Sequence, residues 1–209
     1  MAHSVEQARA SDLFAYVAVS SDSAAILDAA RAAGADLLIP RPDDLASDAA
    51  AKIPVIKHAA TFVEAEVGHR FDTLADLDAT SPLRIPDDII GAVSLLEERG
   101  VSQVITGMRA RHSPYFNLVE LNDEGYVSLS KPTTPRVVRR QDAPRCYDMN
   151  ASVYVWTHEG LFQGEAPFNR DTLLYEMPES RSVDIDSPLD ADFVRFLYDA
   201  SHPSIQSAI

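Results

Sequence analysis

Two aspartates near the C-terminus have the spacing of a metal site. Asp184 and Asp186 lie two residues apart in RSVDIDSPLD, so in extended backbone their side chains point to the same face. Two carboxylates placed in this way suit Mg²⁺, which takes few protein oxygens together with water and substrate phosphates. An isolated D-x-D is more often a solvated acidic turn before a helix, here with Ser187 or Asp190 as the cap. The pair therefore indicates a magnesium site only if other residues converge on it.

A second candidate is the loop DATSPLR, which follows a predicted strand. Pro82 biases Ser81 towards extended backbone, an ordinary turn signal. Loops at the carboxyl ends of parallel strands are where doubly wound sheets bind ligands, so this loop would display its polar side chains at a cleft. Those side chains are Asp78, Thr80, Ser81 and Arg84. A strand-to-helix loop without a ligand explains the pattern equally well.

The third candidate is the basic segment RRQDAPRCYDMNASVYVW. Arg139 and Arg140 point to opposite faces if the backbone is extended, so one guanidinium could pair with an anionic substrate through two parallel hydrogen bonds. The alternative is a basic edge that discourages strand pairing. Asn150 precedes a predicted buried strand and is more often a turn residue than a ligand, and Tyr154 is by default a core residue.

The elements that would position these residues alternate between strand and helix over the first half of the chain. Short apolar runs predict strands, and turn or cap residues such as Gly34, Pro86 and Gly100 delimit helices. Strands are expected at residues 16–22, 35–42, 74–77 and 101–108, and helices at 4–10, 23–34, 53–65 and 86–98. This order predicts parallel βαβ units in an α/β, three-layer, doubly wound fold with a mostly parallel sheet.

The pattern changes after the fourth predicted strand. FNLVELNDEGYVSLS reads as a hairpin with its turn at residues 122–125, and KPTTPRVVRRQDAP is extended and interrupted by prolines. We therefore expect one domain over residues 1–209, with residues 115–145 as a projecting hairpin and extended arm. A buried strand follows at 151–157 and a helix at 191–199.

Composition limits the classes of function. The 209 residues carry a formal net charge of −14, which opposes binding to nucleic acid or anionic membranes but allows a small anionic substrate in a locally basic cleft. The single cysteine, Cys146, cannot form an internal disulfide, which favours a reducing cytoplasm. We see no signal peptide or transmembrane run, no metal spacing among the six histidines and no serine-hydrolase motif.

Taken together, seven segments resemble the acylneuraminate cytidylyltransferases, which join CMP to sialic acid and related bacterial sugars. They are VAVSSDSAAI, RPDDLASD, LDATSPLRIPDDI, SPYFNLVELNDEGYV, RRQDAP, YDMNASVYVW and RSVDIDSPLD. They occur in the order of the family and span nearly the whole chain. The resemblance implies a nucleotide-diphospho-sugar transferase-like fold, CTP and an acidic nonulosonic sugar as substrates, Mg²⁺ as cofactor and a homodimer formed through the extended arm.

The resemblance also assigns roles to residues. It implies that Asp184 and Asp186 are metal ligands and act in catalysis together with Asp78. The nucleotide-binding residues that it implies are Arg41, Asp48 and Ser81, and the sugar-binding residues are Arg140, Asn150 and Tyr154.

Two features depart from the family pattern. Relatives carry a glycine-rich basic loop of the type A-R-G-G-S-K-G after their first strand, whereas this chain starts beyond that position and its eight glycines lie apart. Many relatives also have glutamine in place of Asp78 and serine in place of Lys52. We therefore expect a truncated, weakly active or inactive enzyme, or else a non-catalytic sugar-binding or dimerisation module derived from the family; a misassigned start is a third explanation. Without the first strand, the flanking strands are expected to be exposed and covered by altered pairing or a partner chain.

Overall fold

Strands and helices alternate along the first half of the chain, as the apolar pattern predicts. The computed structural model describes residues 1–47, 50–164 and 167–201. In chain order the first elements are α1 (Ala2–Ala10), β1 (Ala18–Ser21), α2 (Ala24–Ala32), β2 (Leu37–Pro40), η1 (Asp43–Leu45), α3 (Lys52–Val67), β3 (Thr73–Leu77), α4 (Pro86–Arg99) and β4 (Gln103–Arg109). Gly34 and Gly100 adopt positive φ just after α2 and α4. This left-handed conformation ends a helix, and glycine adopts it with little strain because it has no Cβ atom.

The second half contains the predicted hairpin, together with an α-helix and a strand that the sequence did not reveal. Its elements are β5 (Val119–Leu121), β6 (Val127–Leu129), η2 (Arg140–Asp142), β7 (Tyr147–Thr157), α5 (His158–Gln163), β8 (Leu173–Glu176), η3 (Glu179–Arg181) and α6 (Pro188–Ser201). The short helix α5 and the short strand β8 are the unpredicted ones. The final helix begins three residues earlier than expected.

The strands form separate sheets in a layered α/β arrangement. β1 and β2 make a parallel pair, and four strands form a mixed sheet in the order β3-β7-β4-β8. Strand β7 runs antiparallel to both of its neighbours, while β8 is parallel to β4. The α/β class is confirmed. The sheet is interrupted between β1 and β3: these two strands do not pair with each other, and each pairs with only one other strand of the described residues.

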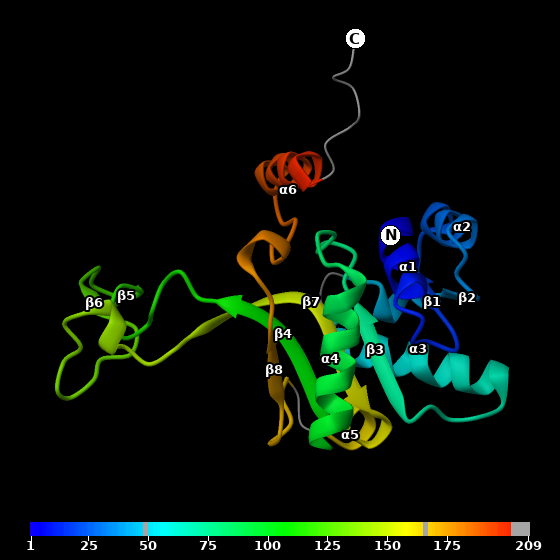
Figure 1. Ribbon diagram of the computed structural model, residues 1–209, viewed down its shortest axis with the longest axis horizontal. Coiled ribbons are helices and arrows are strands. Elements are labelled where there is room, and N and C mark those ends of the chain that lie inside the picture. Colours follow the sequence, from blue (N-terminus) through cyan, green and yellow to red (C-terminus); the bar gives the residue numbers. More distant parts are fainter. Residues whose placement is uncertain (48–49, 165–166, 202–209) are drawn as a thin grey trace, which may run out of the picture.

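The two faces of the mixed sheet carry different helices (Figure 1). Side chains alternate along a strand, so Val153 and Val155 of β7 pack under Ile89 of α4, while Trp156 faces Ala60 of α3 and the helix α5. This alternation also places β3 residues of even number on the α3 face. Asp76 and Asp78 therefore point towards the start of α3.

The hairpin and the chain on either side of it form an arm. Figure 1 shows β5 and β6 projecting away from the sheets at the far ends of β4 and β7. Large apolar side chains on the arm are exposed, among them Leu121, Tyr126 and Val127. Among the described residues, no helix combines the length and the apolar composition needed to cross a membrane.

Candidate active site

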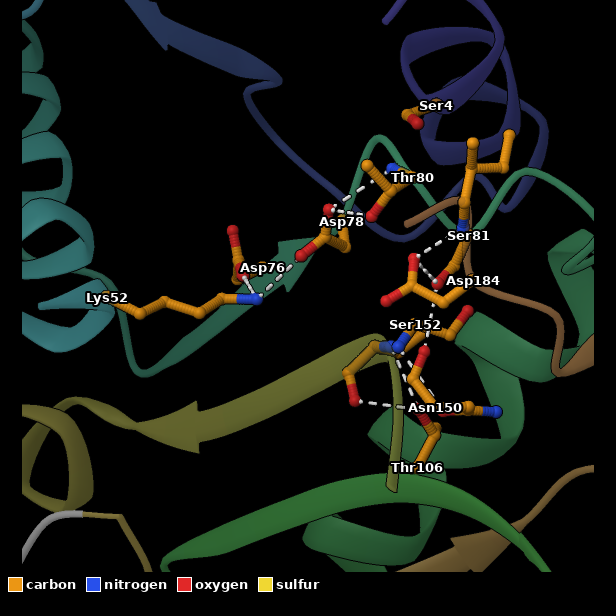
Figure 2. A network of polar contacts seen from close by, with 12 residues as sticks. Ser4, Lys52, Asp76, Asp78, Thr80, Ser81, Thr106, Asn150, Ser152 and Asp184 are labelled. Atoms are coloured by element: carbon orange, nitrogen blue, oxygen red, sulfur yellow. Dashed lines mark hydrogen bonds and ion pairs between the residues drawn. The ribbon is translucent and has the colours of Figure 1, made fainter. Parts of the chain in front are cut away.

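The C-terminal aspartate pair reaches the serine-proline loop. Ser81, which is fully buried, donates a hydrogen bond to the carbonyl of Asn150 at 2.9 Å and lies 3.3 Å from Oδ1 of Asp184. The backbone N–H of Ile185 donates to the carbonyl of Thr80 at 3.0 Å. Figure 2 shows the carboxylate of Asp184 beside Ser81, next to the end of the strand that carries Asp78. Two segments about a hundred residues apart in sequence are thus fastened together.

A lysine lies at the centre of the next group of charges. The Nζ atom of Lys52 is 3.0 Å from Oδ2 of Asp76 and 3.0 Å from Oδ2 of Asp78, and it sits 4.2 Å from the centroid of the Tyr154 ring. Asp76 is directly opposite Tyr154 in the β3–β7 register, and Lys52 opens α3. The other oxygen of Asp78 accepts hydrogen bonds from the backbone N–H and the hydroxyl of Thr80.

These contacts shift the protonation equilibria of the group. Burial by itself raises the pKa of Asp78, but the charge of Lys52 and the hydrogen bonds from Thr80 outweigh it and hold that pKa below its ordinary value. Burial likewise opposes the charged form of Lys52, yet Asp76 and Asp78 raise the pKa of its ammonium. The pKa of Tyr154 is raised, first by burial and also by nearby carboxylates that include Asp184. At neutral pH Asp78 is therefore ionised, Lys52 is charged and Tyr154 is neutral.

Two arginines hold the loops of the site in place. Arg84 was expected at the surface of the cleft, but it is 1% exposed and its guanidinium donates to the carbonyls of Asp78, Ser81 and Ser152. The buried guanidinium holds the loop in place because it supplies hydrogen-bond donors to these three backbone oxygens. Arg181 makes two hydrogen bonds of 2.8 Å to the buried carboxylate of Asp88, which ties the segment before Asp184 to α4.

Asn150 and Tyr154 lie next to this group in different ways. The side-chain oxygen of Asn150 accepts from Thr106 at 2.7 Å, and its amide nitrogen donates to Ser182 at 2.9 Å. Asn150 is 4% exposed, so the structure shows it as a brace beneath Ser81. Tyr154 is half-buried and stacks on Trp156, with ring centroids 5.6 Å apart.

The remaining predicted residues lie further from the centre. Arg41 lines the same cavity as Lys52, Asp76 and Asp78, and its guanidinium donates to the carbonyl of Ser20 at 2.7 Å. Asp48 lies outside the described residues.

Two further predicted residues are exposed. Arg140 lies in η2 on the arm, where no described contact joins it to Asp78 or Asp184. Asp186 lies just before α6, where Ser187 and Asp190 exchange the hydrogen bonds of a helix cap. The acidic-turn interpretation of this segment therefore also holds.

The donor set fits a magnesium ion that is completed by its substrate. In the described part of the chain, no three His, Cys, Asp or Glu side chains are grouped closely enough to enclose a metal. Mg²⁺ binds in many phosphate-handling sites through one or two carboxylates, with water and substrate phosphates as the other ligands. The hydrogen bonds to Asp184 within the described residues all go to Oδ1, so its second oxygen can accept a ligand.

The fold is similar to that of two solved synthases. The structure of CMP:2-keto-3-deoxy-manno-octonic acid synthetase complexed with CTP superimposes with a TM-score of 0.61 at 16% identity, covering 95% of this chain and 87% of that one. A 4-diphosphocytidyl-2C-methyl-D-erythritol synthase from Anaerococcus prevotii gives a TM-score of 0.58 at 10% identity, covering 95% and 89%. At these identities the likeness concerns the fold. No protein-family model matches the chain.

Sequence relatives identify the family. The chain is 42% identical to post-translational flagellin modification protein B of Campylobacter coli, covering 94% of this chain and 83% of that protein. It is 41% identical to CMP-N,N'-diacetyllegionaminic acid synthase of Campylobacter jejuni, with the same coverage. It is also 28% identical to N-acylneuraminate cytidylyltransferase of Escherichia coli, of which it covers 43%. The chain belongs to the acylneuraminate cytidylyltransferase family, a family of nucleotidyltransferase enzymes.

Proposed function

We propose that the chain transfers CMP from CTP to an acidic nonulosonic sugar and releases pyrophosphate. The observation that carries this proposal is the contact between Asp184 and the Ser81 loop, because it brings a carboxylate from the C-terminal segment next to the nucleotide-binding side of an α/β sheet. The names of the relatives support the substrate class. In the reaction, the anomeric hydroxyl of the sugar attacks the α-phosphorus, the bond to pyrophosphate breaks, and the hydroxyl proton passes to solvent.

The charges of the site call for a cation when CTP is bound. Asp76, Asp78 and Asp184 would repel a triphosphate at close range, and Lys52 is already shared between two of them. We propose that Asp184 and Asp186 hold Mg²⁺, which would neutralise developing charge and orient the phosphate. Asp78, held ionised by Lys52 and Thr80, would help to keep that cation and the lysine in place.

The other residues would bind and orient the substrates. Arg41 lines the cavity at Asp78 and offers a positive charge to the nucleotide, and Ser81 positions Asp184 through their contact. We propose that Tyr154 flanks the sugar, that Asn150 supports this side of the site through its hydrogen bonds, and that Arg140 reaches a sugar carboxylate in a neighbouring subunit. The last role requires a homodimer formed through the arm. We also propose a cytoplasmic location, where CTP is available.

The decisive experiment measures nucleotide binding and transfer separately. Calorimetry with CTP and Mg²⁺ is compared with pyrophosphate release in the presence of N,N'-diacetyllegionaminic acid, N-acetylneuraminic acid or pseudaminic acid. Asp184→Asn should lower the rate by roughly a hundredfold or more, since preorganised charge at such a centre is worth about 3 kcal/mol. Asp192→Asn is the control, because Asp192 is exposed on α6 and pairs only with Arg195 in the described contacts. Sugar binding without CTP binding or pyrophosphate release would instead indicate a non-catalytic module.

A further inference from the structure

The chain reaches Asp184 through an irregular segment that continues from β8 to α6 (Figure 1). Its regular part is the three-residue turn η3. At the beginning of the segment, Met177 is 2% exposed and donates its N–H to the carbonyl of Gly107 at 2.8 Å. Between that bond and α6 the segment belongs to no helix longer than η3 and to no strand. The position of the Asp184 carboxylate therefore depends on the separate bonds that attach the segment to its neighbours.

One buried carboxylate attaches this segment to the serine-proline loop. Asp88, in the first turn of α4, is fully buried. Its Oδ1 and Oδ2 atoms accept hydrogen bonds of 2.8 Å from the Nη2 and Nε atoms of Arg181. Its Oδ2 atom also accepts the backbone N–H of Ile85, the residue that directly follows the loop DATSPLR, at 3.0 Å. A bidentate pair of guanidinium and carboxylate, which we call the Arg181–Asp88 fork, fixes direction as well as distance.

The loop and the segment are therefore joined at two places. At one of them, next to Asp184, the N–H of Ile185 donates to the carbonyl of Thr80 at 3.0 Å. The other is the Arg181–Asp88 fork. A single attachment would leave the segment free to turn about it, whereas two attachments fix its orientation against the loop. The fork thus helps to determine where the Asp184 carboxylate lies.

The charges of the site oppose this position of Asp184. Asp76, Asp78 and Asp184 all act on the pKa of Tyr154, so the three carboxylates share one neighbourhood. The ammonium of Lys52 is bonded to the first two, and in the described part of the chain Asp184 has no lysine or arginine partner. Like charges at close range repel one another. The segment that carries Asp184 must therefore be restrained when no cation is bound.

The Arg181–Asp88 fork is the strongest of these restraints. Ser182 is attached to Asn150 by one neutral hydrogen bond at 2.9 Å, and Ile185 is attached to Thr80 by one backbone bond. A hydrogen bond between charged groups is roughly twice as strong as a neutral one, and the fork contains two such bonds. The carboxylate of Asp88 is also shielded from water, which would otherwise weaken the pair.

We propose that Arg181 and Asp88 are positioning residues, whose fork holds Asp184 where it can take Mg²⁺ together with CTP. This inference rests on the proposed function of the chain. Asp88 is fully buried and touches no substrate, so its effect passes through Arg181. The shape of the guanidinium is part of the inference, because an ammonium can supply the charge but not two parallel bonds in one plane.

The first measurement needs no ligand. The double variant Asp88→Asn/Arg181→Met removes both charges, so neither is left unpaired. Amide hydrogen exchange at Ile185 reports on its bond to Thr80 and should become about tenfold faster or more in this variant. Exchange at Val155, buried in β7, should follow only the change in global stability that urea denaturation measures.

Two further variants separate the fork from other changes in the same segment. Arg181→Lys keeps the charge without the fork and should give an intermediate exchange rate at Ile185. Glu179→Gln is the matched control, because Glu179 lies in the same turn η3 and its ion pair with Arg111 is exposed on both sides. It should leave exchange at Ile185 unchanged. Thermal unfolding verifies that each variant folds, and Arg181→Lys decides the question if the double variant does not.

The second measurement concerns the metal. Calorimetry of CTP binding at increasing Mg²⁺ should show that the double variant needs about tenfold more Mg²⁺ for the half-maximal effect. Pyrophosphate release should show the same displacement, while the KM for the sugar changes by less than about twofold. Glu179→Gln should match the wild type in all three quantities. A residue that only stabilises the fold would not change the Mg²⁺ requirement of a folded variant.

The outcomes distinguish this inference from the proposed function. A folded double variant that matches the wild type in exchange at Ile185, or in its Mg²⁺ requirement, overturns the positioning role while the proposed function stands. A wild-type chain without Mg²⁺-dependent CTP binding and without pyrophosphate release overturns the proposed function, and this inference with it.

Discussion

The ammonium of Lys52 contacts two carboxylates and an aromatic ring, so removing its charge should change the ionisation of the carboxylates. In Lys52→Met, the pKa of Asp78 should rise, because the charge of Lys52 is the main influence that lowers it. Carbon-detected NMR titration of the aspartate carboxyls measures this directly. Lys57→Met is the control, since Lys57 lies on the same helix but donates to the carbonyl of Phe162. An unchanged Asp78 titration in Lys52→Met would contradict the ion pair.

The same pair sets a pH dependence with a definite sign. The pKa of Asp78 is lowered in the folded chain, so its stabilisation is present above the ordinary value of 3.8 and is lost as pH falls through the lowered pKa. The raised pKa of Lys52 acts at the other end: its stabilisation is present below 10.5 and is lost as pH rises through the raised value. Both side chains are partly exposed, so the pair contributes about 1 kcal/mol or less. Thermal unfolding below pH 4 and above pH 10 should therefore depend less on pH in Lys52→Met than in wild type.

Arg84 provides the strongest stability prediction for a single residue. Its guanidinium is buried and protonated at neutral pH, because burial lowers its pKa only to about 10. Arg84→Met would leave the carbonyls of Asp78, Ser81 and Ser152 without this donor, and should reduce the free energy of unfolding by about 3 kcal/mol. Urea denaturation measures the change. Arg99→Met, at an exposed site in the last turn of α4, should change it by less than about 0.5 kcal/mol.

Elements were predictable where the chain itself carries their start or stop signals. Helix α4 begins at Pro86 and is followed by Gly100 in the left-handed conformation, and both residues mark these limits in the sequence. Strand β8 has four residues and exists because it pairs with β4, and α5 has six residues supported by Trp156 and neighbouring side chains. Such short elements depend on tertiary contacts. The direction of β7 was equally invisible, because it is set by the path of the arm.

The site was only partly predictable for a related reason. The approach of Asp184 to Ser81 joins elements far apart in sequence, and only the family resemblance indicated it. The Lys52–Asp76–Asp78 group was missed, although the i, i+2 spacing of the two aspartates on a strand places them on one face. The sequence did not reveal that the start of α3, which carries Lys52, lies over the face of β3 that carries the two aspartates. Arg84 was misplaced because sequence does not reveal whether a loop arginine turns inward to carbonyl groups.

The short helix α5 depends on a close approach to the start of β4. A Cβ atom at Gly160 would lie 2.1 Å from the carbonyl oxygen of Ser102, a backbone atom that cannot rotate away. Gly160→Ala should therefore destabilise the protein by about 2 kcal/mol, despite the higher helix propensity of alanine. Chemical denaturation with Glu159→Ala as the exposed neighbour tests this. A stabilised Gly160→Ala would mean that α5 shifts freely on β4.

In the molecule as a whole, the surface expected to form the dimer and the candidate active site lie in different places. The Lys52–Asp76–Asp78 group lies where the start of α3 meets β3. The β5–β6 hairpin projects away from the sheets (Figure 1). A projecting hairpin of three-residue strands is marginal in water without a surface to cover it. Its exposed apolar side chains therefore favour the homodimer that the arm-borne Arg140 would need.

Charge placed on the hairpin should dissociate that dimer. Val127 is 65% exposed on β6, and Val127→Asp would bury an unpaired carboxylate in a contact made by this surface. Light scattering after gel filtration should show a change from twice 22.8 kDa to 22.8 kDa, with unfolding of the monomer body unchanged. Ala65→Asp, at an exposed position on α3 away from the arm, should remain dimeric. Leu121→Asp is a matching variant, because Leu121 is another strongly exposed apolar residue in the strands of this hairpin. If the wild type is a monomer, or if the dimer survives both Val127→Asp and Leu121→Asp, the arm is not the dimer interface.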